Sequence, residues 1–437
     1  MRYYSTNKNA PVVDFAEATI RGQAPDKGLY FPEYIPQVDK NLISEIEKLS
    51  AEEIAFRVIR PYVGDAIDNE SLYKIAAESI SFPIPLVQIN DNVFSLELFH
   101  GPTLAFKDVG ARFMSRCLGY FHSRGAVSDL NGKITVLVAT SGDTGGAVAN
   151  GFYDVEGVEV VILYPSGKVS PVQEKQLTTL GKNIHALEVT GTFDDCQQMV
   201  KQAFTDKDLT EKRFLTSANS INVARWLPQQ FYYFLAYKQW ADKNNPPVIA
   251  VPSGNFGNIC AGILAMQSGL PVKHFIAACN VNDVVSDYLL SGELKPKQAV
   301  ATLSNAMDVG NPSNFVRILE IFKHQFPDIK CKLSSFTITD AETEETIRDL
   351  FRKYNYIADP HAAVGYLALH RYLNNKVDEK GIFLETAHPV KFPAIVESAT
   401  GTVIEVPSAL KDMMKQEKKS QLIGPSYNFL RQFLLDK

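Results

Sequence analysis

The chain has 437 residues, which is too long for one ordinary domain and suggests roughly two to four domains. Hydrophobic residues make up 45% of it and aromatic residues 11%, which is enough for a large core and excludes global disorder. The 44 Lys and Arg residues against 49 Asp and Glu residues give a net charge of −5. This balance excludes a general nucleic-acid binder, although a local basic pocket remains possible.

The first ninety or so residues differ from the rest, and we predict a small N-terminal domain over residues 1–90. They contain a turn-rich stretch at 22–28, and Ser50 before Ala51-Glu52-Glu53 predicts the start of a helix. The N-terminus has no apolar stretch typical of a signal peptide, and no apolar run approaches the ~18 residues that span a bilayer. We therefore expect a cytoplasmic protein without a membrane partner.

Cysteine and histidine patterns give no sign of a metal site or a disulfide framework. The five cysteines are odd in number and widely spaced, and neither CxxC nor HExxH occurs. We expect a reducing compartment and no bound metal.

A lysine at the start of a predicted helix is the first candidate for chemistry. Lys107 follows an apolar stretch and precedes a helical face that includes Val109, Phe113 and Met114. Partial burial would lower the pKa of such a lysine and make it a Schiff-base candidate. The residues alone favour the alternative of a lysine whose stem packs while its ammonium group reaches solvent.

From residue 133 onward, short apolar runs alternate with helical runs. We predict strands over 134–139, 158–164, 184–189, 248–251 and 274–278, and a helix over 194–204. Short, nearly all-apolar strands separated by helices are typical of parallel sheets that helices cover on both faces. The sequence therefore predicts an α/β fold.

Two segments share a strand–loop–helix pattern with glycines in the loop, over residues 138–147 and 251–259. Glycines after a strand allow close backbone approach, and the N-terminus of the next helix offers unpaired N–H groups to an anion. Neither loop matches GxGxxG or the P-loop, which argues against nicotinamide and ATP. One such loop is better explained as a tight turn, but two indicate a ligand with two separate anionic groups.

Together these segments resemble the threonine synthases, a family of pyridoxal-phosphate enzymes of the tryptophan-synthase-β fold type. The resemblance covers most of the chain, from Gly28-Leu29-Tyr30-Phe31-Pro32 to the segment from Glu385 to Phe392. The long lysine segment is specific to this family, whereas the glycine loops are shared across the wider fold type. The resemblance implies two open, twisted, mostly parallel sheets flanked by helices, with pyridoxal 5'-phosphate in the cleft between them.

The resemblance also implies which residues hold the cofactor. Lys107 would form the Schiff base and then act as the acid and base, and the hydroxyl of Thr386 would face the pyridine nitrogen. A hydroxyl does not keep that nitrogen protonated, so the cofactor would be a milder electron sink. The cofactor phosphate would lie against the backbone N–H groups of a loop made of Gly254, Asn255, Phe256, Gly257 and Asn258.

A second set of residues would hold the substrate, O-phospho-L-homoserine. Its phosphate would contact Asn219, Ser220 and Arg225, since an arginine fork with two polar neighbours suits a phosphate dianion. Its carboxylate would lie at the loop of Ser141, Gly142, Asp143 and Thr144. A carboxylate at 143, where related members of the fold type carry Asn, would repel this group. We therefore expect Asp143 to be protonated or turned away.

The implied activity is the conversion of O-phospho-L-homoserine and water to L-threonine and phosphate, the last step of threonine biosynthesis. The alternatives are a serine/threonine dehydratase of the same fold and a non-catalytic descendant that binds a phosphorylated ligand. We expect a monomer with a large cofactor-binding domain over 91–125 and 218–437 and a small domain over 126–217.

Overall fold

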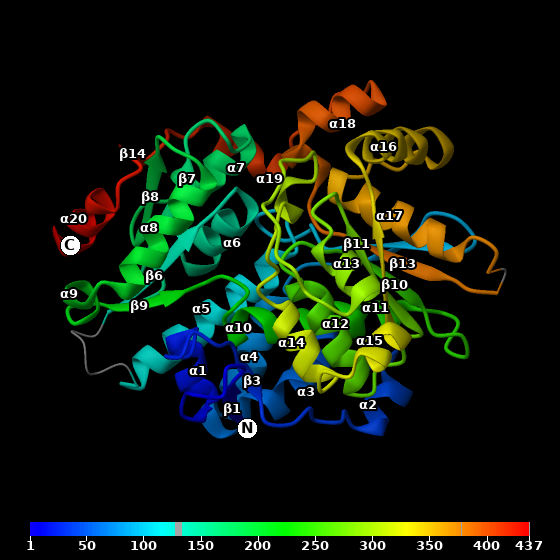
Figure 1. Ribbon diagram of the computed structural model, residues 1–437, viewed down its shortest axis with the longest axis horizontal. Helices are drawn as coiled ribbons and strands as arrows, with labels where there is room; N and C mark the ends of the chain where they lie inside the picture. Colours follow the sequence, from blue (N-terminus) through cyan, green and yellow to red (C-terminus); the bar gives the residue numbers. More distant parts are fainter. Residues whose placement is uncertain (127–132, 377, 437) are drawn as a thin grey trace.

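The computed structural model describes residues 1–126, 133–376 and 378–436. Helices and strands alternate along most of the chain, which forms two parallel-rich sheets and one small antiparallel sheet. The two large sheets lie side by side, and the N-terminal helices lie below them (Figure 1). The predicted α/β fold with an N-terminal domain is confirmed.

The N-terminal part pairs a three-stranded antiparallel sheet with helices. Its elements are β1 (Arg2–Ser5), β2 (Val13–Asp14), α1 (Phe15–Arg21), β3 (Tyr30–Pro32), α2 (Lys40–Glu45), α3 (Ala51–Val63), η1 (Gly64–Ala66) and α4 (Asn69–Ser79). The side chain of Ser50 accepts a hydrogen bond from the backbone N–H of Glu53, so the predicted cap of α3 is confirmed. The hydroxyl of Tyr3 donates to the carbonyl of Tyr62 and fastens the sheet to α3.

The large sheet has the strand order β12-β11-β10-β13-β5-β4 and is parallel except for its last pair. Its strands are β4 (Leu86–Gln88), β5 (Val93–Glu97), β10 (Val248–Pro252), β11 (His274–Cys279), β12 (Leu333–Thr337) and β13 (Gly381–Glu385). Successive residues of β10 enter different cores, since Ile249 and Val251 join one hydrophobic cluster while Val248 and Ala250 join another. Both faces are therefore covered, as the apolar runs predict.

The small sheet is parallel throughout, in the order β14-β8-β7-β6-β9. Its strands are β6 (Ile134–Ala139), β7 (Val158–Pro165), β8 (Ile184–Val189), β9 (Phe214–Ser217) and β14 (Ser420–Ile423). The two faces again bury alternate residues, with Val136 and Val138 on one side and Leu137 on the other. The predicted strands over 134–139, 158–164 and 184–189 are confirmed to within one residue.

The C-terminal segment departs from the expected domain division, which assigned all of 218–437 to the large domain. Strand β14 pairs with β8, and α20 (Tyr427–Asp436) packs against α8 (Phe193–Thr205) in the small domain. Leu430 and Leu434 supply the reason, because they fill the small-domain core beside Met199. We call the small sheet with its helices, including this C-terminal segment, the small domain, and the large sheet with its helices the large domain. The other proposed boundaries stay a prediction.

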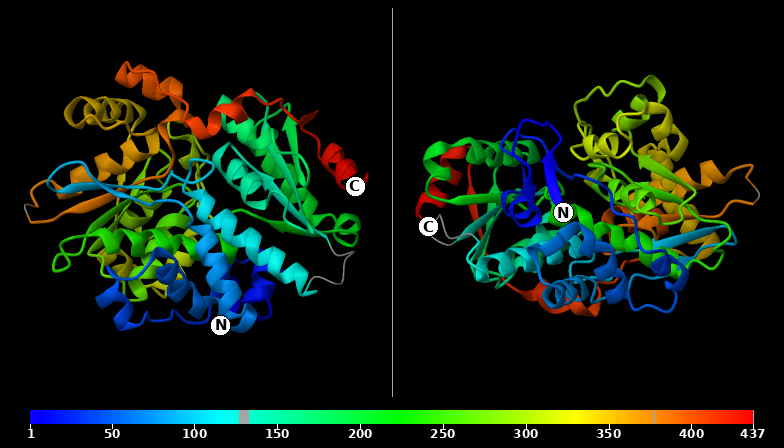
Figure 2. Two further views of the ribbon diagram at one scale, coloured as in Figure 1. Left: turned by 180° about the vertical axis from the view of Figure 1, so that it is seen from behind. Right: turned by 90° about the horizontal axis from the view of Figure 1, so that it is seen from below.

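Helix α5 (Lys107–Ser123) connects the parts of the molecule. It packs against α4, α6 (Asp143–Phe152) and α10 (Val223–Trp226). It starts in the middle of the molecule and runs outward beneath the small domain (Figure 2). The remaining helices are α7 (Pro171–Thr178), α9 (Lys207–Thr210), η2 (Leu227–Gln229), α11 (Gln230–Gln239), α12 (Gly257–Gln267), α13 (Val284–Ser291), η3 (Asn305–Met307), α14 (Phe315–Ile321), α15 (Phe326–Lys332), α16 (Asp340–Tyr354), α17 (Pro360–Leu373), η4 (Pro389–Lys391), α18 (Pro393–Thr400) and α19 (Ser408–Lys415).

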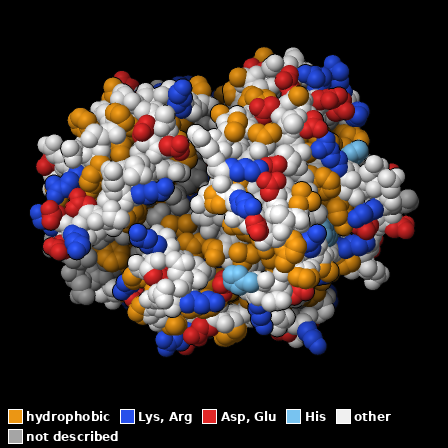
Figure 3. Space-filling view, in the orientation of Figure 1, with side chains coloured by type: hydrophobic (Ala, Val, Ile, Leu, Met, Phe, Trp, Pro, Cys, Tyr) orange, Lys and Arg blue, Asp and Glu red, His pale blue; other side chains and the backbone are white. Residues whose placement is uncertain are grey.

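The surface is hollowed between the two domains (Figure 3). None of the helices within the described ranges combines the length and apolar character needed to cross a membrane. Likewise, the described residues contain no group of three or more His, Cys, Asp or Glu side chains that could hold a metal ion.

Candidate active site

Lys107 is the first residue of α5, as the sequence predicts. Its side chain is mostly buried, and its Nζ lies 3.9 Å from Oδ2 of Asp143. Burial lowers the pKa of Lys107 more than the nearby carboxylate raises it, and the cations of Lys391 and Arg225 lower it further. A larger share of neutral amine suits a lysine that forms a Schiff base.

A buried carboxylate next to Lys107 shapes the loop that leads into α5. Oδ2 of Asp108 accepts the backbone N–H of Thr103 at 2.9 Å, and Oδ1 accepts the Thr103 hydroxyl at 2.5 Å. Gly101 lies so close that a Cβ there would come within 2.4 Å of Oδ2 of Asp108. Sequence reasoning missed Asp108, although it lies within the lysine segment, because its partner belongs to a loop of irregular backbone.

The loop at residues 254–258 joins the end of β10 to the start of α12. Within the described part of the chain, no protein acceptor is recorded for the backbone N–H groups of these five residues. Gly254 permits close packing, since a Cβ there would lie 2.7 Å from Cα of Met307. Phe256 adopts a left-handed conformation with φ of 61° and turns the chain into α12. The free N–H groups at the N-terminus of a buried helix form a cradle for a phosphate.

Asn258 adds a side-chain donor to this cradle. Its Nδ2 is buried and has no hydrogen-bond partner in the described structure. Its Oδ1 accepts the hydroxyl of Tyr233 at 2.8 Å, which fixes the orientation of the amide. A buried amide nitrogen without an acceptor is costly unless a ligand supplies one, so the loop fits the phosphate of pyridoxal phosphate.

The loop at residues 141–144 joins β6 to α6 in the small domain. The hydroxyl of Thr140 accepts the backbone N–H groups of Gly142 at 3.0 Å and Gly145 at 2.9 Å, which sets the turn. Gly142 has a φ of 141° and lies against Gln173, whose side chain would clash with a Cβ. For the N–H groups of Ser141, Asp143 and Thr144, no acceptor is recorded among the described residues. They are available to a carboxylate.

The surroundings of the Asp143 carboxylate favour its ionised form, which argues against the expected protonated form. Its Oδ1 accepts hydrogen bonds from Nζ of Lys391 at 2.7 Å and from Nε2 of Gln173 at 2.9 Å. Burial alone would raise the pKa of Asp143, but the ammonium groups of Lys391 and Lys107 lower it well below its usual value. Sequence reasoning missed this pair, although Lys391 lies in the family-like segment from Glu385 to Phe392.

Thr386 directly follows β13 and is mostly buried. Its backbone carbonyl accepts the N–H of Phe106 at 2.9 Å, one residue before Lys107. This bond places the end of β13 beside the start of α5. The role of its hydroxyl toward a pyridine nitrogen stays a prediction.

Arg225 lies in α10 and is only 4% exposed, so it is not the ordinary surface charge that its position on a helix would allow. One guanidinium nitrogen donates to the carbonyl of Ala218, and its Nε is buried without a hydrogen-bond partner in the described structure. Burial lowers the pKa of Arg225 to about 10, still far above neutrality. A buried cation with a free donor fits an anionic ligand.

The phosphate-binding candidates and the cofactor loop are neighbours in space. A Cβ on Gly257 would lie 3.1 Å from Cβ of Ser220, which places the two loops in contact. Asn314 links them, because its N–H donates to the carbonyl of Asn255 at 3.2 Å and its Nδ2 donates to the Ser220 hydroxyl at 2.9 Å. Asn219 is partly exposed on the same loop. The 219–220 segment and the 254–258 loop therefore lie against each other.

Arg317 holds the backbone of the loop that carries Asn219 and Ser220. Sequence reasoning also missed this residue. It is fully buried, and its guanidinium group donates to the carbonyls of Ser220 and Tyr30 at 2.9 and 3.1 Å. It also stacks on Trp226 at 4.3 Å from the ring centre. Its role is to fasten the 219–222 loop to β3.

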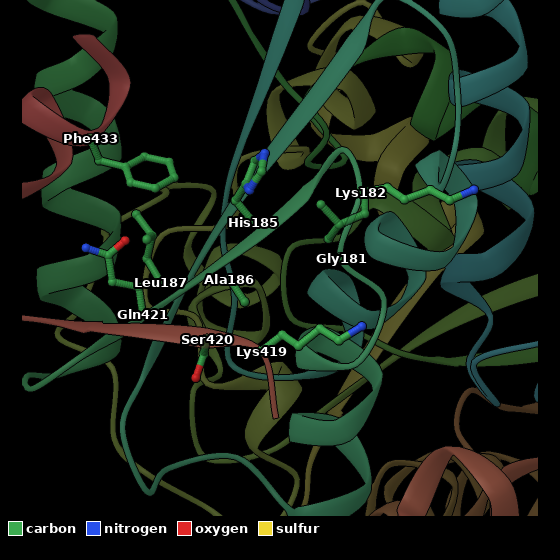
Figure 4. Close-up of a pocket in the computed structure, with 10 residues that line it drawn as sticks. Gly181, Lys182, His185, Ala186, Leu187, Lys419, Ser420, Gln421 and Phe433 are labelled. Atoms are coloured by element: carbon green, nitrogen blue, oxygen red, sulfur yellow. The ribbon is translucent and has the colours of Figure 1, made fainter. Parts of the chain in front are cut away.

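A separate hollow of about 320 Å³ lies on the small domain, away from these residues. Phe433 and Gln421 lie on one side of it, with Lys182 and Lys419 on the other (Figure 4). None of the predicted site residues lines it, so the candidate site is the centre around Lys107.

Comparison with known proteins agrees with this geometry. Residues 82–384 match the family described as pyridoxal-phosphate dependent enzymes, and the chain belongs to this class. Residues 2–80 match the threonine synthase N terminus, and residues 362–434 match the threonine synthase C-terminal family. The chain is 44% identical over 436 residues to the threonine synthase of Haemophilus influenzae, with 100% of both chains covered. It therefore belongs to the threonine synthases, lyases of amino-acid biosynthesis whose cofactor is pyridoxal phosphate.

Solved structures show the same fold. The threonine synthase of Escherichia coli superposes with a TM-score of 0.91 and 42% identity, covering 100% of both chains. The pyridoxal-phosphate-bound threonine synthase of Brucella melitensis gives a TM-score of 0.91 and 35% identity, covering 99% of this chain and 98% of that one.

Proposed function

We propose that the protein converts O-phospho-L-homoserine and water to L-threonine and phosphate. The observation that carries the proposal is the presence of two separate places that suit an anion. One is the free N–H cradle at 254–258, and the other is Arg225, which is buried with an unpartnered Nε. Pyridoxal phosphate and O-phospho-L-homoserine each carry a phosphate, and each would occupy one of these two places. A serine/threonine dehydratase, whose substrate carries no phosphate, would need only the first.

Each group has a distinct task in this reaction. Bound pyridoxal phosphate supplies an electron sink that stabilises negative charge on the substrate's carbon atoms. Nζ of Lys107 takes the proton from the substrate's α-carbon and returns it at the end of the cycle. Arg225, with Asn219 and Ser220, binds the phosphate and stabilises the charge that develops as it leaves.

The other candidate residues bind rather than react. The N–H groups of Ser141, Asp143 and Thr144, which have no acceptor among the described residues, would hold the substrate carboxylate. The hydroxyl of Thr386 would face the cofactor's ring nitrogen. Water must be excluded until the elimination is complete, and the position of the 141–144 loop on the small domain suits closure of the cleft over the substrate.

The direct test is turnover of O-phospho-L-homoserine by the purified holoenzyme. We expect phosphate and threonine to appear in equal amounts. Release of a 2-oxo acid from serine or threonine, without phosphate release from phosphohomoserine, would contradict the proposal and favour the dehydratase. We also propose a monomeric, cytoplasmic enzyme, and sedimentation of the purified protein tests the first of these.

Lys107→Ala should abolish both turnover and the absorption band of the lysine-bound cofactor, because the covalent attachment point is lost. Lys415→Ala is the matched control, since Lys415 is exposed and its one recorded ion pair among the described residues is with Asp412 on α19. A Lys107→Ala protein that borohydride still converts to a covalent lysine adduct would show that another lysine binds the cofactor.

A further inference from the structure

An ion pair joins the two domains inside the candidate site. Lys391 ends η4 in the large domain, and its side chain is 0% exposed. Its Nζ lies 2.7 Å from Oδ1 of Asp143, which begins α6 in the small domain and whose side chain is 5% exposed. Among the described residues, Asp143 is the only recorded acceptor for Nζ of Lys391.

The segment that carries Lys391 is held firmly. The backbone N–H of Val390 donates to Nδ1 of His388 at 3.1 Å, and the N–H of Lys391 donates to the carbonyl of His388 at 3.0 Å. Val390 packs in a small hydrophobic cluster with Leu104 and with Val172 of α7. This cluster contains residues of both domains. The packing of Val390 therefore fixes the backbone of Lys391 at a place from which its side chain reaches Asp143.

The two oxygens of Asp143 have different surroundings. Oδ1 accepts both Lys391 and Gln173, the latter at 2.9 Å, whereas Oδ2 faces Nζ of Lys107 at 3.9 Å. Without Lys391, the nearest cation for this buried carboxylate would be the ammonium form of Lys107. The negative charge of Asp143 would then raise the pKa of Lys107 and keep its amine protonated, although the reaction needs the neutral amine. The same charge would repel a substrate carboxylate at the 141–144 loop.

We propose that Lys391 is a positioning residue for the reaction, which neutralises Asp143 and holds it away from Lys107. The pair also ties the carboxylate-binding loop to the wall of the cofactor cleft. The two residues are then useful only together, because Lys391 without Asp143 is a buried ammonium group without a counter-ion. This inference rests on the proposed function in one respect, which is the choice of O-phospho-L-homoserine as the substrate.

A double-mutant cycle tests the pair in the holoenzyme. The variants are Lys391→Met, Asp143→Asn and the double variant, with Lys415→Met as the exposed control. In Lys391→Met we expect kcat/KM for O-phospho-L-homoserine to fall by about 30-fold or more, as for other buried charge pairs that lose one partner. The acid limb of the pH profile should also move to higher pH. The double variant, which removes both charges, should recover at least about tenfold in kcat/KM and restore the acid limb.

Two results would overturn the proposal. One is a double variant that is no better than Lys391→Met, since a purely structural lysine gives that outcome. The other is an unchanged acid limb in Lys391→Met. If the methionine variant does not fold, Lys391→Gln serves instead, because it keeps a donor for Asp143 without the charge.

Thermal unfolding of the cofactor-free proteins separates this inference from the proposed function. Each single variant should lower the melting temperature, and the double variant should lower it by less than the sum of the two. Additive losses would overturn the inference whatever the substrate proves to be. If the coupling is present but phosphohomoserine is not turned over, the proposed function fails and the pairing of Lys391 with Asp143 stands.

Discussion

At the scale of single residues, burial decides what a charged side chain can do. Arg225 is 4% exposed and has no carboxylate partner among the described residues, whereas Arg317 is fully buried with its donors used by backbone carbonyls. The first is free to bind a ligand and the second is structural. Sequence alone gives the two arginines the same chemistry.

Arg225→Ala should leave the cofactor bound while lowering kcat/KM for O-phospho-L-homoserine. The expected loss of transition-state stabilisation is about 2–4 kcal/mol, by analogy with the removal of other oxyanion donors. Arg225→Lys should recover only part of it, because a point charge does not reproduce a bidentate fork. The measurements are kcat/KM and cofactor absorbance, with Arg352→Ala on the exposed face of α16 as the control. Loss of the cofactor, or a near-normal kcat/KM, would show that Arg225 does not bind the substrate phosphate.

At the scale of elements, α5 is the helix that positions the chemistry. It begins at Lys107 and packs against α10, which carries Arg225. The close approach depends on Gly110, because a Cβ there would lie 2.6 Å from the carbonyl oxygen of Arg225. A glycine inside a helix weakens it by about 1 kcal/mol relative to alanine, so packing is the reason for Gly110.

Gly110→Ala should therefore destabilise the protein although it improves helix propensity. We expect a loss of about 1–3 kcal/mol, typical of overpacking, together with weaker turnover as α5 and α10 move apart. Gly119→Ala in the same helix is the matched control, since among the described atoms its Cβ would meet only Cγ1 of Val155, at 3.3 Å. Urea unfolding measures both variants. Equal stability of the two would show that the α5–α10 contact is not tight.

At the scale of the whole molecule, the C-terminal segment packs against the small domain, whose other strands come from the first half of the chain. Strand β14 adds an edge to the small sheet, and α20 covers one face of it. The small domain is thus built from two distant segments, and its stability depends on the C-terminal residues as well as on 133–217.

Two partly buried histidines should make the whole fold sensitive to acid. Burial lowers the pKa of both His274 and His388 to about 4. Because the unfolded chain titrates near pH 6.5, it takes up protons first, so stability is full above that value and falls as pH drops toward 4. Between about pH 7 and pH 5, each histidine should cost about 1 kcal/mol after allowance for solvent screening.

His274→Phe should reduce this loss, because His274 already stacks on Tyr372 with ring centres 5.0 Å apart. Urea unfolding at the two pH values measures the effect, and His370→Gln, at an exposed position of α17, is the control. A variant with the same pH dependence as the wild type would show that His274 is not held neutral.

The sequence determined the local architecture and much of the candidate site. The apolar runs place strands to within one residue, and Ser50 marks a helix start that the structure reproduces. Such signals are local, since strand burial and helix capping depend on neighbouring residues. The motif segments likewise indicated Lys107 and the 254–258 loop before any contact was known.

Only the tertiary structure decided how distant segments meet. The pairing of Asp143 with Lys391 joins residues 248 positions apart, and β14 pairs with a strand more than two hundred residues earlier. The charge state of Asp143 and the burial of Arg225 follow from such contacts. No local pattern encodes them, because the free energy of a buried charge depends on which group packs beside it in the folded chain.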